Sequence, residues 1–382
     1  MEVLIGYMID GRNSGIDKYL LRVLRVFYDA GIHADILTGK DNVDLRACLA
    51  PFKAEIHEIP GLMHPQKQYK AMRKILSQKA YDAAYFNISE PMHCIGAKAA
   101  HDAGVSRVIL HSHSTSQGES SIVKAFLKSF MNGRSRNKLP KYANDYYACS
   151  KAAAKWLFPS ELVEQNKVKI LYNPIEVERY AFDSAVRAKM RSVLGFSEKD
   201  VVLGHIGNYV TAKNSAYLLK ILQKTREKLP NAKLLLIGDG PDRLAVEAQA
   251  KEMRLFEHMQ FLGIRDDVPS LLQAMDAFLL PSLFEGLPVS AIEAQVAGLK
   301  TFLSDRITDE VKLTDDCVFL DIENNGETWE RATSNIHQAI QVLLLSPNKK
   351  DKYIKIASGD YVPFLQDGTS GYSFVLEKPD VG

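Results

Sequence analysis

Two carboxylates stand eight positions apart in a segment that also has the features of a helix start. Glu285 follows a buried-strand pattern, and Glu293 falls inside the short helix predicted after it. Pro288 suits the first position of that helix, since its missing N–H would have no partner there. The backbone N–H groups of residues 286–290 would then form the positive end of a helix dipole, where a phosphate binds readily. A phosphate seat between two acidic side chains indicates a phosphorylated, hydroxyl-rich ligand, and we expect a nucleotide sugar.

Glycines and a lysine follow other predicted strands. Lys213 lies on a loop that opens a helix, shortly after Gly207. Gly11 and Gly15 bracket the loop after the first strand, but the pattern G-x-x-x-x-G-K-[ST] is missing, which argues against a P-loop kinase or ATPase. Gly238 begins a Gly-Asp-Gly turn that matches only part of G-x-G-x-x-G, so a dinucleotide-dependent oxidoreductase is poorly supported.

The bulk composition is typical of a soluble globular protein. The chain has 382 residues, 46% of them apolar and 25% charged, and a length of this order predicts two domains. A net charge of +2 gives no reason to expect a nucleic acid as partner. The four cysteines are scattered and form no C-x-x-C pair, the start lacks a secretory signal, and no apolar run approaches ~20 residues. We expect a cytoplasmic protein.

Short apolar runs alternate with segments of helical period, which predicts parallel sheets covered by helices. The predicted strands span residues 3–8, 34–38, 54–59, 83–87, 107–111, 146–149, 168–171, 201–206, 233–237, 259–262, 277–280, 301–303 and 318–320. The predicted helices include residues 18–30, 67–78, 212–228 and 338–345.

A turn dipeptide at residues 173–174, followed by a charged stretch, predicts a domain boundary near residue 175. We therefore predict an α/β protein of two doubly wound Rossmann-like domains, over residues 1–175 and 176–360, with an irregular tail over 361–382. Because open α/β sheets bind ligands beyond the carboxyl ends of their strands, the two domains are expected to face one another across a cleft.

Residues 281–294 resemble the E-x7-E signature of family-4 retaining glycosyltransferases of the GT-B fold, most of all those of the bacterial capsule and exopolysaccharide branch. The likeness covers most of the chain through motifs in a matching order, namely His111-Ser112-His113-Ser114, Ala148-Cys149-Ser150-Lys151, Asn173-Pro174-Ile175, Gly204-His205-Ile206-Gly207, Lys213-Asn214, Leu236-Ile237-Gly238-Asp239-Gly240 and Phe261-Leu262-Gly263. The resemblance implies a hexosyltransferase that binds its acceptor on the first domain and a nucleoside-diphosphate sugar on the second.

The resemblance also assigns roles to individual residues. It makes Glu285, His113 and Lys213 the catalytic set: Glu285 contacts the donor sugar, Lys213 the diphosphate, and His113 either of them. Glu293 holds the ribose hydroxyls. The other assignments, around the phosphates, ribose and base, fall on Gly11, Gly15, Asn208, Gly238, Arg265, Gly286, Leu287 and Pro288.

Asn208 is a departure from the family, because many relatives carry an arginine there. An amide can hydrogen-bond a phosphate, but it cannot neutralise the phosphate or grip it with a charged fork. Three interpretations follow: Lys213 acts alone, Arg12 takes the place of the arginine, or the activity is weak.

A metal-bridged diphosphate is not predicted. His111 and His113 close a strand and share one side of it, but no carboxylate or third histidine stands near them in the sequence. The chain has no D-x-D, and adjacent acids such as Asp266-Asp267 point apart. We therefore predict a metal-independent site without a cofactor, in which basic groups and a helix N-terminus balance the charge of the donor.

Residues 120–144 contain no acidic side chain. They carry six bases (Lys124, Lys128, Arg134, Arg136, Lys138 and Lys141) and apolar residues at helical spacing. One interpretation is an amphipathic helix packed on its own domain, with a solvated basic face. The other is a peripheral contact with anionic lipid on the inner face of the cell membrane, near a lipid-linked acceptor.

The predicted function is a retaining glycosyltransferase that moves a sugar from a nucleoside-diphosphate donor, expected to be UDP-linked, to a cell-surface polysaccharide precursor. The acceptor is a glycan or a lipid-linked intermediate. Two alternatives from other classes stay open: a UDP-sugar 2-epimerase, which would convert the donor alone, and a catalytically silent protein that binds nucleotide sugars.

Overall fold

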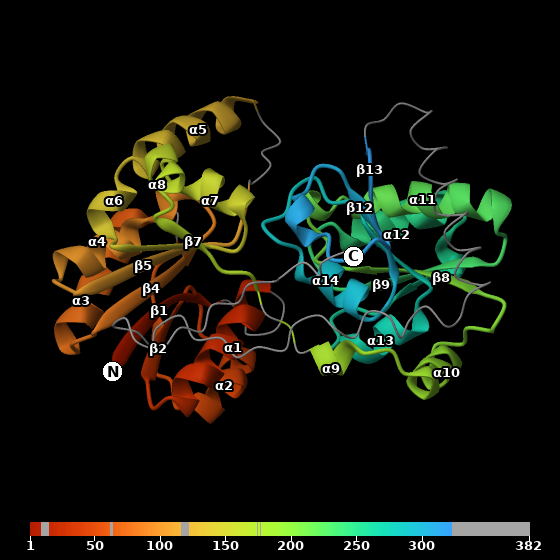
Figure 1. The fold of residues 1–382 in the computed structure, drawn as a ribbon, viewed down its shortest axis with the longest axis horizontal. Coiled ribbons are helices and arrows are strands. Elements are labelled where there is room, and N and C mark those ends of the chain that lie inside the picture. The colour runs from red at the N-terminus through yellow and green to blue at the C-terminus, as the bar shows by residue number, and fades with distance from the viewer. Residues whose placement is uncertain (9–14, 62–63, 116–121, 174, 176, 323–382) are drawn as a thin grey trace, which may run out of the picture. The chain divides into compact units, whose positions relative to one another are not determined.

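The computed structural model describes residues 1–8, 15–61, 64–115, 122–173, 175 and 177–322. The chain divides into two compact units between residues 174 and 175. Each unit contains a parallel sheet with helices on its faces, so the predicted α/β class is confirmed (Figure 1). Gly11, Arg12, the predicted helix over 338–345 and the predicted tail over 361–382 lie outside the described residues.

The N-terminal unit is built on a seven-stranded parallel sheet in the order β3-β2-β1-β4-β5-β6-β7. Its central strands are apolar and buried, as the fully buried Val3, Leu4 and Ile5 of β1 illustrate. The strands are β1 (Glu2–Met8), β2 (His33–Thr38), β3 (Ile56–Glu58), β4 (Ala83–Ile88), β5 (Arg107–Ser112), β6 (Asp145–Ala148) and β7 (Val168–Ile170). The strand order reverses between β1 and β4, which are neighbours in the sheet.

Helices cover both faces of this sheet. They are α1 (Gly15–Asp29), α2 (Val43–Leu49), α3 (Pro65–Gln78), α4 (Ile95–Asp102), α5 (Ile122–Arg136), α6 (Leu139–Tyr142), α7 (Lys151–Leu157) and α8 (Ser160–Glu164). In Figure 1, α1 and α2 lie on one side of the strands, and α5, α6 and α8 lie on the other. Leu20, Val23 and Phe27 of α1 recur at helical spacing and join the same core as β1 and β2, which is why this segment is helical and packed there.

The C-terminal unit has a six-stranded parallel sheet in the order β10-β9-β8-β11-β12-β13. The strands are β8 (Val201–Ile206), β9 (Ala232–Ile237), β10 (Met259–Phe261), β11 (Ala277–Leu280), β12 (Lys300–Ser304) and β13 (Cys317–Leu320). β9 and then β10 lie on one side of β8, and β11 pairs with the other side of β8. At such a switch point the loops that follow the two neighbouring strands diverge and leave a crevice for a ligand.

The helices of this unit are α9 (Val177–Tyr180), α10 (Ser184–Val193), α11 (Ser215–Lys228), α12 (Arg243–Glu252), α13 (Val268–Ala274) and α14 (Val289–Val296). Figure 1 shows α11 on one side of the strands and α10 and α13 on the other. Leu218 and Leu222 of α11 pack into one core with Leu203 of β8 and Leu279 of β11. This core fixes the two strands whose loops carry the candidate site.

The predicted helix starts differ from those of the structure by one to three residues. The helix predicted over 212–228 begins at Ser215, because residues 211–213 form a 3₁₀ turn and Asn214 takes a left-handed conformation with φ of 52°. Pro288 precedes α14 as its N-cap and is not its first helical residue, since its ψ of 98° is not helical. The other strands and helices within the described residues were predicted correctly apart from small shifts of their ends.

Candidate donor-binding site

The loops after β8 and β11 meet through a charged pair. Lys213 ends the 3₁₀ turn after β8, and its Nζ lies 2.5 Å from Oε1 of Glu285 on the loop after β11. The hydroxyl of Ser282, which is fully buried, donates to the same carboxylate oxygen at 2.7 Å. Because β8 and β11 are neighbours at the switch point, residues 72 positions apart form one small cluster. The side chains of Lys213 and Glu285 stay partly accessible, at 19% and 13%.

Backbone contacts hold the two loops in this arrangement. The N–H of Leu283 donates to the carbonyl oxygen of Ala212 at 2.8 Å. The side-chain amide of Asn214 donates to the carbonyl oxygen of Pro281 at 3.2 Å. Asparagine is one of the few residues that adopt the left-handed conformation at small cost, so Asn214 serves both the turn and the contact between the loops. Asn214 stands in the predicted motif Lys213-Asn214, but no role was predicted for it.

Glu293 lies in α14, as predicted, and is only 8% exposed. The hydroxyl of Tyr180 donates to Oε1 of Glu293 at 2.6 Å. Tyr180 ends α9 and lies 113 positions before Glu293, so no local pattern pointed to it. The Glu285 loop continues into the first turn of α14 through Gly286, Leu287 and Pro288. The first N–H groups of a helix have no intrahelical acceptor.

The turns after β8 and β9 approach each other closely enough to require glycine. Gly238 has φ of +130°, and a Cβ built on it would lie 2.1 Å from the carbonyl oxygen of Gly207. Asn208 follows Gly207, and its backbone N would lie 3.6 Å from that Cβ. A Cβ on Gly207 would in turn lie 3.3 Å from Cδ of Lys213. Gly207, Asn208, Gly238 and Lys213 therefore share one edge of the sheet.

Arg265 follows β10, at the far side of the same edge. It is exposed, and its guanidinium binds Asp267 through Nε at 2.8 Å and one terminal nitrogen at 2.7 Å. This carboxylate partly balances the charge that Arg265 could offer a ligand. Its predicted role near the base stays a prediction.

A buried histidine lies directly beneath this edge. His205 on β8 is 1% exposed, and its Nδ1 lies 2.9 Å from the carbonyl oxygen of Leu279, so Nδ1 carries the proton. Its Nε2 has no hydrogen-bond partner among the described residues and would lie 3.0 Å from a Cβ on Gly207. Burial lowers the pKa of His205 to about 4, so the ring is neutral near pH 7.

We expect His205 to make the folded protein sensitive to mild acid. Its folded pKa lies below the ordinary value near 6.5, so the unfolded chain binds the proton first, and stability falls as the pH drops from about 6.5 towards 4. His205→Asn keeps a donor for Leu279 and removes the titration. Between pH 7 and pH 5.5 the variant should lose about 1 kcal/mol less unfolding free energy than the unsubstituted protein, as measured by urea denaturation. Equal losses would show that His205 does not carry this dependence.

The N-terminal unit carries the histidines of the predicted catalytic motif. His113 follows β5, and its Nε2 lies 2.8 Å from Oδ1 of Asn87 at the end of β4. The amide nitrogen of Asn87 donates to the carbonyl oxygen of Gly6 on β1 at 3.1 Å, across the switch point of this sheet. Because Oδ1 of Asn87 accepts, Nε2 of His113 carries the proton and Nδ1 is the acceptor. Asn87 is a buried polar residue in an otherwise apolar strand, and no role was predicted for it.

The ring of His113 is neutral near pH 7. The residue is half-buried, but its ring packs on the rings of His111 and Tyr19, with centroids 4.0 and 5.0 Å away. This burial lowers the pKa of His113 to about 3, and the pKa of the fully buried His111 is also lowered by burial. His111 bonds Tyr85, whose hydroxyl lies 3.0 Å from that of Tyr19. The two histidines share one side of the strand, as predicted. Gly15 is the first residue of α1 in the same unit.

Two groups of side chains within the described ranges are close enough to share a metal ion. One is Glu2, His33 and Asp35, and the other is Asp35, Glu55 and His57. Both lie at the amino-terminal ends of β1 to β3, not at the carboxyl ends that carry His113. The Nζ of Lys79 is 2.7 Å from Glu2 and 2.7 Å from Asp35, so an ammonium group already balances these carboxylates. The expectation of a metal-independent site stays a prediction.

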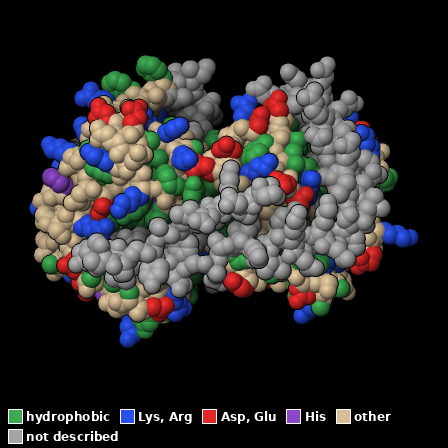
Figure 2. Space-filling model, in the orientation of Figure 1, with side chains coloured by type: hydrophobic (Ala, Val, Ile, Leu, Met, Phe, Trp, Pro, Cys, Tyr) green, Lys and Arg blue, Asp and Glu red, His purple; other side chains and the backbone are tan. Residues whose placement is uncertain are grey.

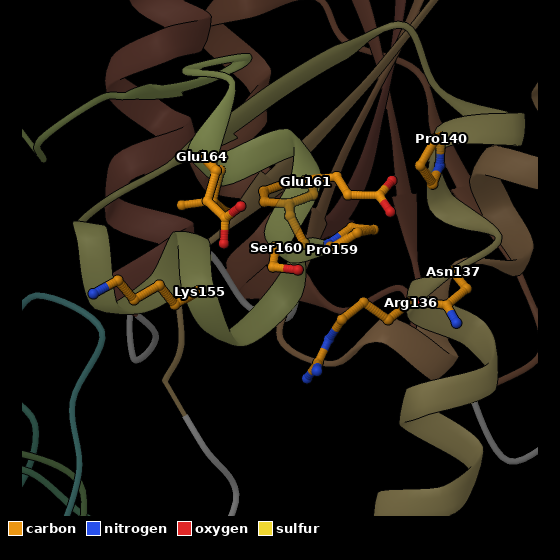
Figure 3. A pocket seen from close by; sticks show the side chains of 10 residues that line it. Arg136, Asn137, Pro140, Lys155, Pro159, Ser160, Glu161 and Glu164 are labelled. Carbon is orange, nitrogen blue, oxygen red and sulfur yellow. The ribbon is translucent and has the colours of Figure 1, made fainter.

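A cavity of roughly 640 Å³ opens on the N-terminal unit. Figure 3 shows that its lining comes from the end of α5 and from α6, α7 and α8. The charged residues in it are Arg136, Lys155, Glu161 and Glu164, two of each sign. None of the predicted site residues lines it, so the cavity is separate from the candidate donor site.

Comparison with known protein families identifies the C-terminal unit. Residues 186–358 match the family model described as glycosyl transferases group 1. This segment is a glycosyl transferases group 1 domain. It contains Lys213, Glu285 and Glu293, so the charged cluster at the β8–β11 switch point belongs to the group 1 domain.

Curated relatives extend the likeness. The chain is 33% identical over 222 residues to the putative glycosyltransferase EpsF of Bacillus subtilis, which covers 56% of this chain and 55% of that protein. It is 26% identical over 254 residues to the UDP-Gal:alpha-D-GlcNAc-diphosphoundecaprenol alpha-1,3-galactosyltransferase of Escherichia coli, covering 64% and 63%. The matched regions thus span less than two thirds of either relative.

Solved structures show the fold. The Anabaena protein Alr3699/HepE, crystallised with UDP and glucose, superimposes with a TM-score of 0.70 at 19% identity, over 93% of this chain and 92% of that one. WaaG, a glycosyltransferase of lipopolysaccharide biosynthesis, gives 0.65 at 14% identity, over 93% and 98%. The predicted GT-B fold is confirmed by these likenesses. The assignment to family 4 and to the capsule branch stays a prediction.

Proposed function

We propose that the protein is a retaining glycosyltransferase that moves a sugar from a UDP-linked donor to a lipid-linked polysaccharide precursor. The observation that carries the proposal is the cluster of Lys213, Glu285 and Ser282 at the switch point of a group 1 domain. A carboxylate and an ammonium 2.5 Å apart provide charges of both signs where a donor sugar and its diphosphate would meet.

Each charge suits one part of the reaction. As the bond between the sugar and the diphosphate breaks, positive charge develops on the sugar ring and negative charge on the leaving group. Glu285 would stabilise the first and Lys213 the second, together with the N–H groups at the start of α14. Glu293 would hold the ribose hydroxyls, and Gly238 lets the β9 turn approach the nucleotide closely. No metal ion is required in this scheme.

Retention of configuration follows from attack on the same face that the diphosphate leaves. A covalent double displacement would need a second carboxylate as nucleophile. Among the described residues of the donor site, Glu285 is the carboxylate proposed for the sugar, because Glu293 is assigned to the ribose. We therefore propose front-face attack on an oxocarbenium-like species. The ring of His113 in the N-terminal unit is neutral and its Nδ1 is an acceptor, and its role towards the donor stays a prediction.

The nature of the donor and acceptor is proposed from the named proteins. HepE was crystallised with UDP and glucose, and the Escherichia coli relative is named for UDP-Gal and a diphosphoundecaprenol acceptor. The relatives are named glycosyltransferases, which gives no support to an epimerase.

A single experiment separates the three functions. The purified protein is incubated with a panel of UDP- and GDP-sugars, with and without a short-chain polyprenyl-diphosphate sugar, and the products are analysed by NMR. Transfer with an axial linkage from an α-linked donor supports the proposal. Conversion of the donor without an acceptor indicates an epimerase. Binding by calorimetry with neither hydrolysis nor transfer indicates a silent protein, and either result overturns the proposal.

We further propose that α5 places the protein on an anionic membrane. Phe126, Phe130 and Met131 of α5 are 77%, 56% and 42% exposed. Arg134 lies one turn after Phe130, with its guanidinium carbon 5.7 Å from that ring. Figure 2 shows hydrophobic and basic side chains near one another along the edge where α5 lies, with acidic side chains beside them. Aromatic rings beside exposed bases are what an amphipathic helix at an anionic lipid surface presents.

The contacts of the individual bases support a role in lipid binding for some of them and not for others. Lys128 binds Glu90 at 2.9 Å, and Arg136 donates to the carbonyl oxygen of Trp156 at 2.7 Å, so both are directed towards the protein. Arg134, Lys138 and Lys141 are exposed and stay available for lipid phosphates. No helix within the described ranges is long and apolar enough to span a membrane.

Replacing both Phe126 and Phe130 with serine should weaken binding to vesicles that contain anionic lipid at least about tenfold, because two large apolar side chains are lost from the contact. The measurement is vesicle flotation at low salt, with vesicles of neutral lipid alongside. Leu244→Ser is the matched control, because Leu244 is 78% exposed on α12, and its replacement should leave vesicle binding unchanged. Failure of the unsubstituted protein to float with anionic vesicles at low salt would refute the membrane proposal.

A further inference from the structure

We propose that Tyr180 is a positioning residue for the donor nucleotide, which acts by fixing the carboxylate of Glu293. This inference rests on the proposed function, because it takes Glu293 as the group that binds the ribose hydroxyls. Tyr180 belongs to none of the motifs found in the sequence. It is identified by its contact with a site residue on a helix far along the chain.

The contact is short and buried. The Tyr180 hydroxyl donates to Oε1 of Glu293 at 2.6 Å, and the two residues are 6% and 8% exposed. An O–H···O⁻ bond of this length is charge-assisted and stronger than a bond between neutral groups. It also selects one rotamer of the glutamate, since Oε1 must stay within reach of a hydroxyl on a rigid ring.

The backbone of Tyr180 is itself held by a buried glutamine. Gln273 of α13, which is 3% exposed, donates to the carbonyl oxygens of Tyr180 and Ala181 at 3.3 and 3.4 Å. The side-chain oxygen of Gln273 accepts from the backbone N–H of Asp183 at 3.2 Å. Gln273 thereby fixes the end of α9, and α9 contacts both α13 and α14. The tyrosine ring is therefore a rigid support for Glu293.

The chemistry of the pair explains why a ribose needs it. An ionised carboxylate only accepts hydrogen bonds, and it has about four acceptor positions on its two oxygens. Tyr180 uses one position on Oε1 and leaves the ribose hydroxyls to donate to others in a fixed direction. Without Tyr180 the carboxylate would lose the bond that fixes Oε1, and nucleotide binding would have to supply that alignment. The loss of nucleotide affinity should appear only with ligands that carry the ribose hydroxyls.

The test is Tyr180→Phe, which removes one oxygen and keeps the ring. Calorimetry measures the affinity of the unsubstituted protein and the variant for UDP and for 2′,3′-dideoxy-UDP, with GDP and its dideoxy form in parallel. We expect the variant to bind the ribonucleotide about tenfold more weakly, as for a lost hydrogen bond to a charged group, and to bind the dideoxy form unchanged. In a Glu293→Gln background the same substitution should have no further effect.

Tyr217→Phe is the matched control, because Tyr217 is a tyrosine of the same unit with 7% exposure. It should leave both affinities unchanged. Suppose that the unsubstituted protein binds the ribonucleotide more tightly than the dideoxy form. If Tyr180→Phe then weakens the binding of both forms equally, or of neither, the inference on Tyr180 is overturned and the proposed function stands. If the unsubstituted protein does not distinguish the two forms, the role of Glu293 in the proposed function is overturned together with it.

Discussion

Glu285→Gln should lower the rate of sugar transfer about a thousandfold while the protein stays folded and still binds its donor. The substitution keeps the shape of the side chain and an oxygen that can accept from Ser282 and Lys213. It removes the negative charge that the proposed mechanism places next to the developing oxocarbenium ion. A preorganised electrostatic group in a water-poor site contributes about 3–4 kcal/mol to transition-state stabilisation, which corresponds to this loss.

The kinetic pattern distinguishes this role from donor binding. If Glu285 acts on charge that exists only in the transition state, kcat falls and the KM for the donor changes little. If it contributes equally to binding of the ground state, KM rises and kcat is kept. Steady-state rates at several donor concentrations separate the two cases.

Glu227→Gln provides the control for a lost carboxylate in the same unit. Glu227 pairs with Lys224 at 2.9 Å on the exposed side of α11. Such a surface pair contributes little to stability, and its loss should leave transfer within about twofold of the unsubstituted protein. Full transfer activity in Glu285→Gln would show that Glu285 does not have the role assigned to it.

The sequence was sufficient to predict the elements of the fold and the position of both glutamates. Apolar runs such as 201–206 and 277–280 are strands because each is buried on both faces, and a central parallel strand is a short continuous apolar run. The change to helical period after Pro288 indicated α14, and Glu293 was placed inside it correctly. These signals are local, so they can be found without knowing the order of the strands.

The pairing of Lys213 with Glu285 could not be predicted from local signals. It depends on β8 and β11 lying next to each other, although β9 and β10 come between them in the sequence. The same applies to Tyr180, whose partner lies 113 positions away, and to Asn87, which joins His113 to Gly6 across the switch point of the other sheet. Periodicity reports which face of an element is buried, but it does not report which element covers that face.

Asn208, which departs from the family pattern, lies at the candidate site. It shares the sheet edge with Gly238 and Lys213, so this position borders the candidate site. The proposed mechanism uses the ammonium of Lys213 for the diphosphate, and the other candidate cation, Arg12, lies outside the described residues.

Lys213→Gln should lower kcat/KM about a hundredfold to a thousandfold, because the leaving diphosphate loses a point charge in a site of low dielectric. Affinity for UDP should fall as well, and more than affinity for UMP, which has one phosphate fewer. Calorimetry with the two nucleotides measures this difference. UDP binding as tight as that of the unsubstituted protein would contradict the assignment of Lys213 to the diphosphate.

The double variant Lys213→Gln with Glu285→Gln separates catalysis from folding. Each single variant keeps one partly buried charge and loses the opposite charge of the pair, whereas the double variant keeps neither charge. The thermal midpoint of the double variant should therefore lie above that of the less stable single variant. Transfer should not recover with stability, since the two charges act on different parts of the transition state. Lys224→Gln serves as the matched control for the lysine. If activity returned along with stability, the pair would be structural, and the charges at the switch point would not be those that drive transfer.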